Sequence, residues 1–235
     1  MYSMAAPHAK GKSAEDNIFA ANNRAIALAE KIGTENVVNA TVGSILDEDG
    51  SLVVLDVVKE ALSALTPKEM CAYAPIQGYR AFLDACIDQC FGKSRPEGYI
   101  DACSTPGGTG VLHHVVHNYS EVGDEVLISD WHWGAYDSLI DDNNRKVRTF
   151  SLLTEDGHFH AADFKEKVED ILSRQDNIVI ILNGIANNPT GYCLSDEEWQ
   201  AAIDVLKEAV KDETKKAILV PDVAYLDYSG KKEEC

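Results

Sequence analysis

The chain has 235 residues, of which 45% are hydrophobic and 26% are charged, and its formal net charge is −18. These are ordinary globular values, and the length suits one sizeable domain with part of a second. The strongly acidic balance argues against nucleic acid and anionic membranes as partners.

The cysteines and the hydropathy of the sequence indicate in which cellular compartment the protein is expected. The sequence contains neither a secretory signal nor an apolar run long enough to span a bilayer. We therefore expect a cytoplasmic protein, with no membrane partner, whose cysteines are free thiols. The six cysteines are Cys71, Cys86, Cys90, Cys103, Cys193 and Cys235.

Two side-chain pairs resemble metal ligands, but we expect no metal site. Cys86 and Cys90 share a helix face, yet no nearby Cys/His pair completes a zinc site. His113 and His117 are also four residues apart, but His114 occupies the position where the zinc-protease pattern requires glutamate. We therefore interpret this cluster as packing or surface histidines.

Helical and strand-like segments alternate along the chain. Apolar spacing predicts helices at residues 16–31, 55–65, 79–91, 111–119, 161–173 and 195–210, and a helical stretch ending near residue 141. Short β-rich runs predict strands at residues 37–40, 99–103, 125–129, 147–153, 178–182 and 217–220. This alternation predicts an α/β fold with a mostly parallel sheet flanked by helices.

Two polar loops follow neighbouring strands of this predicted sheet. Asn183-Gly-Ile-Ala-Asn-Asn-Pro-Thr-Gly191 follows one apolar run, and Asp222-Val-Ala-Tyr225 follows the next. A helix between the two strands makes them parallel, so both loops lie at the carboxyl edge, where ligands of open α/β sheets bind. Asn188 and Asp222 should therefore lie close together.

A glycine-rich turn, Thr105-Pro-Gly-Gly-Thr-Gly110, enters another predicted helix. The first backbone N–H groups of a helix have no intrahelical partner, and its dipole favours an anion there. The Thr109 hydroxyl adds a donor. A dinucleotide-binding fingerprint would need a third glycine at the position of His113, so that alternative fails.

Taken together, these motifs resemble the class I, aspartate/aromatic-type aminotransferases, which are fold-type I enzymes dependent on pyridoxal 5'-phosphate (PLP). The resemblance runs from about Gly43 to Tyr228. It implies an N-terminal arm at residues 1–14, the N-terminal part of a small domain at 15–47, and the PLP-binding large domain at 48–235, incomplete at its C-terminal end.

The resemblance also assigns roles around the cofactor ring. Asp222 would hold a proton on the pyridine nitrogen, which lets the ring accept electrons. Asn188 and Tyr225 would hydrogen-bond its phenolic oxygen, and Trp131 would stack on one face of the ring, although it could instead be a core or interface aromatic.

Further positions follow from the same resemblance. Gly108 and Thr109 would bind the cofactor phosphate, and Gly43 would pass close to the substrate unless it is a plain turn glycine. Tyr73 would reach the phosphate of the neighbouring subunit, which implies a homodimer. The alternative for Tyr73 is a packed loop aromatic.

The family's Schiff-base lysine has no match in this sequence, so we assign no catalytic residue. Lys231 and Lys232 follow Asp222 too closely to correspond to that lysine. We expect the chain to be the N-terminal half of an aminotransferase polypeptide and to be inactive alone. The complete enzyme would move an amino group between aspartate or an aromatic amino acid and a 2-oxo acid.

Alternatives are another fold-type I PLP enzyme, such as a carbon–sulfur lyase or a synthase, and a non-catalytic PLP-fold fragment that acts as a binding module.

Overall fold

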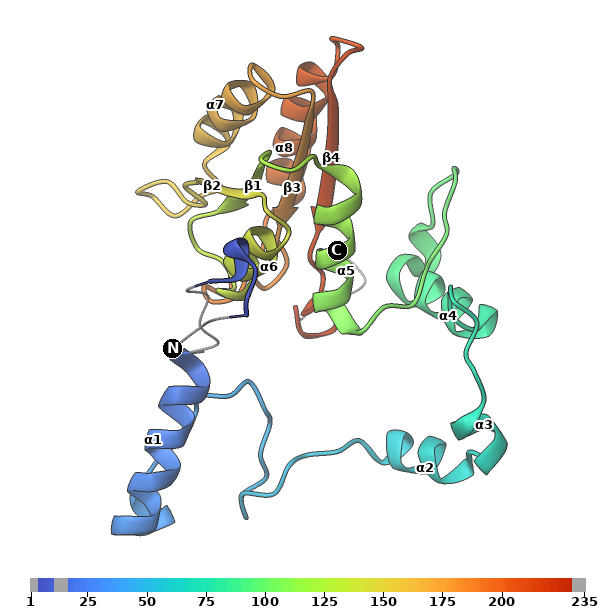
Figure 1. The fold of residues 1–235 in the computed structure, drawn as a ribbon, viewed down its shortest axis with the longest axis vertical. Coiled ribbons are helices and arrows are strands. Elements are labelled where there is room, and N and C mark those ends of the chain that lie inside the picture. Colours follow the sequence, from blue (N-terminus) through green and yellow to red (C-terminus); the bar gives the residue numbers. More distant parts are fainter. Residues whose placement is uncertain (1–3, 11–16, 230–235) are drawn as a thin grey trace. The chain divides into compact units, whose positions relative to one another are not determined.

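The computed structural model describes residues 4–10 and 17–229 (Figure 1). It separates into two units, Met1–Tyr73 and Ala74–Cys235, which are described in turn. The arm, small-domain and large-domain boundaries expected from the sequence stay predictions.

Unit 1 is built from short helices and extended chain. Its elements are η1 (Pro7–Ala9), α1 (Asn17–Ile32), η2 (Thr34–Asn36), α2 (Asp56–Ala64) and α3 (Pro67–Cys71). The helices expected at residues 16–31 and 55–65 are confirmed as α1 and α2. The strand expected at residues 37–40 is wrong, because this segment has no partner strand in the described part of the unit.

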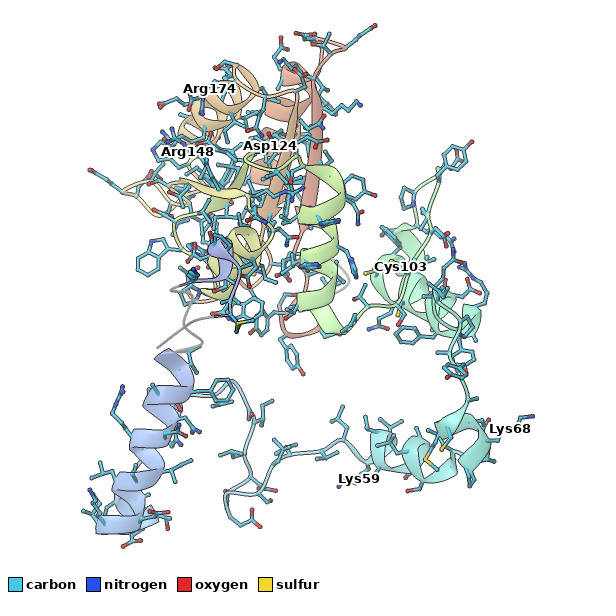
Figure 2. All side chains as sticks on the ribbon, in the orientation of Figure 1. Lys59, Lys68, Cys103, Asp124, Arg148 and Arg174 are labelled. Carbon is cyan, nitrogen blue, oxygen red and sulfur yellow. The ribbon has the colours of Figure 1, made fainter. Side chains whose placement is uncertain are left out.

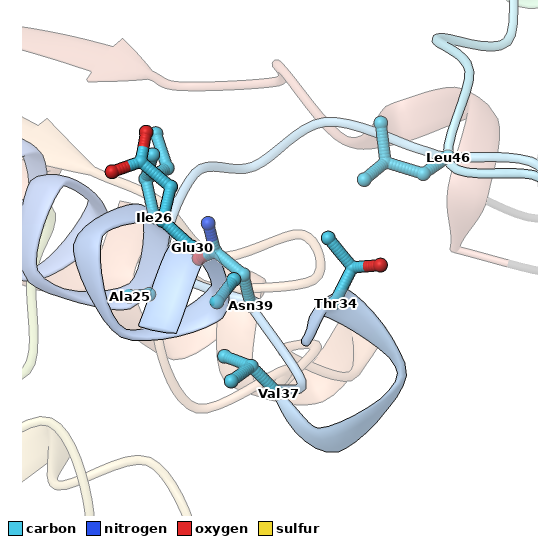
Figure 3. Close-up of a pocket in the computed structure, with 8 residues that line it drawn as sticks. Ala25, Ile26, Glu30, Thr34, Val37, Asn39 and Leu46 are labelled. Atoms are coloured by element: carbon cyan, nitrogen blue, oxygen red, sulfur yellow. The ribbon is translucent and has the colours of Figure 1, made fainter. Parts of the chain in front are cut away.

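No residue that the structure describes in unit 1 is fully buried. Its helices therefore present large apolar side chains to solvent, among them Phe19, Leu28 and Leu62, and Leu46 in the extended chain is exposed as well. A shallow groove between α1 and the chain after it is lined by Ala25, Ile26, Ala29, Glu30, Thr34, Val37, Asn39 and Leu46 (Figure 3).

Unit 2 contains the four-stranded sheet. Its strands are β1 (Glu125–Ser129), β2 (Lys146–Phe150), β3 (Asn177–Leu182) and β4 (Lys216–Pro221). Its helices are α4 (Arg80–Phe91), η3 (Gly92–Ser94), α5 (Gly107–Tyr119), α6 (Ala135–Asp142), α7 (Ala161–Leu172), α8 (Asp196–Ala209) and η4 (Leu226–Tyr228). The strand order is β2-β1-β3-β4, and every neighbouring pair is parallel, so the expected α/β fold is confirmed.

Alternate side chains of the central strands build two separate cores. Leu127 and Ile180 face α7 and α8, whereas Val126 and Ile181 face α5 and α6. Since both faces are covered, residues 126–128 of β1 and 178–182 of β3 are all apolar. The sheet is thereby a rigid platform for the loops at its carboxyl edge.

The outer strand β4 is less covered than its neighbour. Its residues 217–220 are half-buried, whereas Ile178–Leu182 of β3 are fully buried. In the part of the chain that the structure describes, no strand pairs with the outer edge of β4.

Charged residues gather at the opposite end of the sheet from the loops that follow β1, β3 and β4. Figure 2 shows Asp124 and Arg174 there, and Arg148 in the middle of β2. Asp170 of α7 accepts hydrogen bonds from Arg148 at 3.1 Å and from Arg174 at 2.8 Å. These ion pairs are partly exposed, so each contributes modestly to stability.

Two sequence expectations need correction in unit 2. The segment 99–103 forms no strand. Its Tyr99 is fully exposed, its Asp101 accepts a hydrogen bond from Arg80 of α4 at 3.0 Å, and the N–H of the following Ser104 donates to the Gln77 carbonyl. The strand expected at 147–153 ends at Phe150, because the chain turns there and Leu153 forms an isolated antiparallel bridge with Phe159.

The described residues contain no helix long and apolar enough to cross a membrane. The five cysteines in this part of the chain are free and exposed, and Cys235 lies outside it.

The N-terminus of α8 is fixed by the capping box that the sequence predicts. The Ser195 hydroxyl accepts from the Glu198 N–H, and Glu198 accepts from the Ser195 N–H at 2.9 Å. Glu198 also accepts from the Tyr192 hydroxyl at 2.6 Å and from the Phe159 N–H at 2.8 Å. One carboxylate thus joins α8 to two loops.

These contacts make Glu198 a source of acid sensitivity. Burial raises the pKa of Glu198, but the hydrogen bonds from Tyr192, Phe159 and Ser195 outweigh burial and hold that pKa below its ordinary value. Because the pKa is lower in the folded chain than in the unfolded chain, the ionised form stabilises the fold at neutral pH. That contribution is lost as the pH falls through the lowered pKa.

We expect Glu198→Gln to lower the free energy of unfolding by about 1 kcal/mol at neutral pH, because an amide cannot accept at both terminal atoms. The difference from the wild-type chain should shrink as the pH falls below the ordinary glutamate range. Urea unfolding at a series of pH values measures both effects. Glu213→Gln, in the exposed turn after α8, is the control and should change stability little. Equal effects of the two substitutions would contradict the assignment.

Candidate active site

Polar residues meet where β1, β3 and β4 end. The strands are parallel and in register, with Ile128 opposite Ile181 and Leu182 opposite Pro221. Their following residues therefore emerge at one edge of the sheet, as expected from the sequence.

Asp222 is held at this edge by four hydrogen bonds. Its N–H donates to the Leu182 carbonyl at 3.0 Å, and its carbonyl accepts from the Asn183 side-chain amide at 2.8 Å. Its carboxylate accepts from the Ala224 N–H at 3.1 Å and from the Tyr136 hydroxyl at 2.5 Å. The carboxylate is half-buried and therefore still open to a ligand.

Asn188 and Tyr225 lie side by side, as the sequence predicts for residues of these two loops. The Asn188 amide donates to the Tyr225 hydroxyl at 3.4 Å. The Asn188 backbone N–H donates to the Asn183 side-chain oxygen at 2.6 Å, which ties this pair to the residue that also binds the Asp222 carbonyl. Both side chains remain partly exposed.

Asn183 and Asn187 organise the loop that carries Asn188. They are only 3% and 2% exposed, and their side chains bond to the backbone of all three strand ends. Asn187 donates to the carbonyls of Trp131 at 3.2 Å and Asn183 at 3.1 Å, and accepts from Thr190. Buried polar groups need such partners, so these two asparagines fix the loop geometry.

The Trp131 backbone is fixed while its indole is free. Its carbonyl accepts from the Ser129 hydroxyl at 2.7 Å as well as from Asn187. The side chain is 54% exposed, so Trp131 is not a core aromatic of unit 2. Trp133, by contrast, packs against the buried core.

The N-terminus of α5 lies at the same edge. A short turn joins α5 to β1, and the helix therefore runs opposite to the strands and begins near their carboxyl ends (Figure 1). The helix starts at Gly107, four residues earlier than expected, and no side chain caps it.

The glycines at this helix start have different roles. Gly107 has a φ of +66°, which favours glycine. A Cβ at Gly110 would lie 2.8 Å from Pro106 Cδ, whereas a Cβ at Gly108 would meet open space. Gly108 and Thr109 are exposed. Their N–H groups and the Thr109 hydroxyl are therefore accessible to an anion from solvent.

Two of the predicted site residues belong to unit 1. Gly43 has open space beside it, and the Tyr73 side chain is fully exposed. Their placement at the site stays a prediction. Lys231 and Lys232 lie outside the described residues. Among those the structure describes, no three His, Cys, Asp or Glu side chains gather as a metal site.

The sequence interpretation placed Asn183 and Asn187 in the loop at this edge but assigned them no role, and it did not assign Tyr136 to the site. The two asparagines carry a usable signal, since polar residues directly after a buried strand need hydrogen-bond partners there. Tyr136 carries none, because its hydroxyl meets a carboxylate 86 positions away.

Known proteins share this sequence pattern. A family model described as "Aminotransferase class I and II" matches residues 35–233. The chloroplastic aspartate aminotransferase of Arabidopsis thaliana is 30% identical over 204 residues, which cover 83% of this chain and 43% of that protein. The aromatic-amino-acid aminotransferase of Escherichia coli K12 is 25% identical over 206 residues, covering 84% and 49%.

Solved structures share the fold. The crystal structure of an aminotransferase from Anaerococcus prevotii matches with a TM-score of 0.95 and 37% identity, covering 99% of this chain and 57% of that one. An aromatic-amino-acid aminotransferase of Burkholderia pseudomallei, covalently bound to pyridoxal phosphate, matches with a TM-score of 0.66 over 92% of this chain and 53% of its own, but at 21% identity it shows the fold alone.

The chain spans about half the length of the curated relatives it matches. The match nevertheless extends from unit 1 through both polar loops of the carboxyl edge. The chain belongs to the class I and II aminotransferase family.

Proposed function

We propose that this chain forms the cofactor-binding part of a PLP-dependent aminotransferase that moves an amino group between aspartate or an aromatic amino acid and a 2-oxo acid. The observation that carries the proposal is the half-buried, hydrogen-bonded carboxylate of Asp222 beside the Asn188–Tyr225 pair. The names of the relatives, aspartate and aromatic-amino-acid aminotransferases, support the substrate class.

The donors and acceptors at the edge fit PLP. Asp222 would hold the proton on the ring nitrogen, and the amide of Asn188 and the hydroxyl of Tyr225 would donate to the phenolic oxygen. Gly108 and Thr109 would bind the phosphate at the start of α5, and the exposed indole of Trp131 would cover the ring. Once bound, the cofactor supplies an electron-accepting ring.

The proposed enzyme is a cytoplasmic homodimer. Tyr73 would reach the phosphate in the partner subunit, which its full exposure supports. Gly43 would line the substrate side, where open space surrounds its backbone.

Asp222→Asn tests the central assignment. We expect saturable PLP binding by the wild-type chain and binding about tenfold or more weaker in the variant, because hydrogen bonds to charged groups contribute roughly 1.5–3 kcal/mol. Equilibrium dialysis measures both affinities. Asp212→Asn, in the exposed turn after α8, is the control and should bind as the wild-type chain does. Equal affinities in all three chains would contradict the proposed role of Asp222.

Thr109→Val tests the phosphate site. The substitution keeps the side-chain shape but removes the hydroxyl donor, so PLP should bind roughly fivefold more weakly while pyridoxal, which has no phosphate, is unaffected. The ratio of the two affinities isolates the phosphate contribution from reactions of the aldehyde with surface lysines. Thr214→Val is the matched control. A parallel loss for both compounds would place the phosphate elsewhere.

We further propose that the 235-residue chain alone does not transfer amino groups, because it has no lysine at the family's spacing from Asp222. Incubation with PLP, aspartate or tyrosine, and a 2-oxo acid should yield no new amino acid by chromatography. Transfer by the purified chain would refute this part of the proposal. Release of sulfide or ammonia from cysteine would instead favour the lyase alternative, and PLP binding without any turnover agrees with a chain that lacks the lysine.

A further inference from the structure

A buried tyrosine donates to the carboxylate that the proposed function requires. Tyr136 lies in the first turn of α6, and its side chain is 1% exposed. Its hydroxyl reaches Oδ2 of Asp222 at 2.5 Å. This bond joins α6 to the loop after β4.

The direction of this hydrogen bond is fixed by the environment of the hydroxyl. Burial, and then the hydrogen bond to Asp222, raise the pKa of Tyr136 far above its ordinary value. The hydroxyl therefore keeps its proton at any working pH and acts as the donor. Oδ1 of Asp222 accepts separately from the Ala224 N–H.

The Tyr136 ring is held on two sides. The His132 ring lies parallel to it with centroids 6.1 Å apart, and the Trp133 ring meets it edge-on at 5.9 Å. His132 is in turn held between the Ser129 carbonyl at 2.8 Å and the Asp137 carboxylate at 3.1 Å. The donor thus has a single well-defined position relative to the end of β1.

An aspartate directly after a strand can otherwise rotate about its side-chain bonds. Its backbone is fixed by Leu182 and Asn183, but those contacts do not orient the carboxylate plane. The two bonds from Tyr136 and Ala224 do, one at each oxygen. Without the hydroxyl, Oδ2 would lose its protein partner, and the Ala224 N–H would hold the group alone.

We propose that Tyr136 is a positioning residue, which orients the Asp222 carboxylate for its contact with the cofactor ring nitrogen. The inference rests on the proposed function, since it concerns the same site. The segment from Trp131 to Tyr136 would then have two roles at the cofactor. The Trp131 indole would cover the ring, and the Tyr136 hydroxyl would orient the Asp222 carboxylate.

Tyr136→Phe tests this role, because it removes one oxygen and leaves the packed ring. We expect PLP affinity to fall about tenfold in equilibrium dialysis. The absorbance of bound PLP should change with pH at a midpoint about one unit lower than in the wild-type chain, since a carboxylate free to turn away stabilises the protonated ring nitrogen less.

Tyr192→Phe is the matched control. Its hydroxyl also donates to a carboxylate, Glu198 at 2.6 Å, on the α8 side of the sheet. Removal of that hydroxyl should lower stability and leave PLP affinity and the pH midpoint unchanged. A purely structural role of Tyr136 would make the two variants alike, which would overturn the proposal.

Tyr136→Met is the second variant if the phenylalanine chain does not fold, since methionine is flexible enough to fill the same space. It should show the same weaker binding and the same shift of midpoint. If the variant that folds binds PLP with the wild-type affinity and shows the wild-type pH midpoint, the inference about Tyr136 is overturned and the proposed function is not. Absence of saturable PLP binding by the wild-type chain would overturn the proposed function, and this inference with it.

Discussion

The side-chain amide of Asn183 joins the ends of two parallel strands, and the geometry of the carboxyl edge depends on it. It donates to the backbone of Asp222 after β4 and accepts from the backbone of Asn188 after β3. Asn187 extends the same network to the carbonyl of Trp131 after β1. Both amides are buried, so loss of either partner would leave polar groups unsatisfied at a cost of roughly 1–3 kcal/mol. Residues that would never touch a ligand therefore determine where the ligand-facing ones lie.

This network works because the sheet below it is stiff. The central strands place their apolar side chains alternately into two cores, and close packing on both faces leaves little freedom to shift. Backbone hydrogen bonds, such as the one from the Asp222 N–H to the Leu182 carbonyl, connect the polar loops to this rigid sheet. The side chains of the proposed cofactor site would therefore be held in place before a ligand binds.

The sequence predicts the parts of the fold whose signals are local. The apolar runs of β1, β3 and β4 and the Ser195–Glu198 capping box each identify their element, and the parallel crossover places Asn188 near the end of β4. The segments 37–40 and 99–103 carry strand-like residues as well, but β structure needs a partner, and propensity alone cannot supply one.

The remaining site features depend on tertiary contacts that leave no mark on local sequence. Tyr136 fits its helix as an ordinary buried aromatic, and only the packing of α6 against the sheet brings its hydroxyl to Asp222. The start of α5 is similarly set by the positive φ of Gly107 and by the close approach of Gly110 to Pro106. Pattern analysis can name the residues of such a site, whereas their mutual orientation follows from the assembled core.

The partial exposure of strand β4 affects the tendency of the chain to associate with other molecules. Its backbone donors and acceptors form a template that a strand of another molecule could extend, and its four central residues are apolar. Lys215 and Lys216 precede this run, and Pro221 ends it without an N–H to offer. The two lysines at one end and the proline at the other limit the length of strand that another molecule can pair with. The strand that presents Asp222 thus also carries features that oppose self-association.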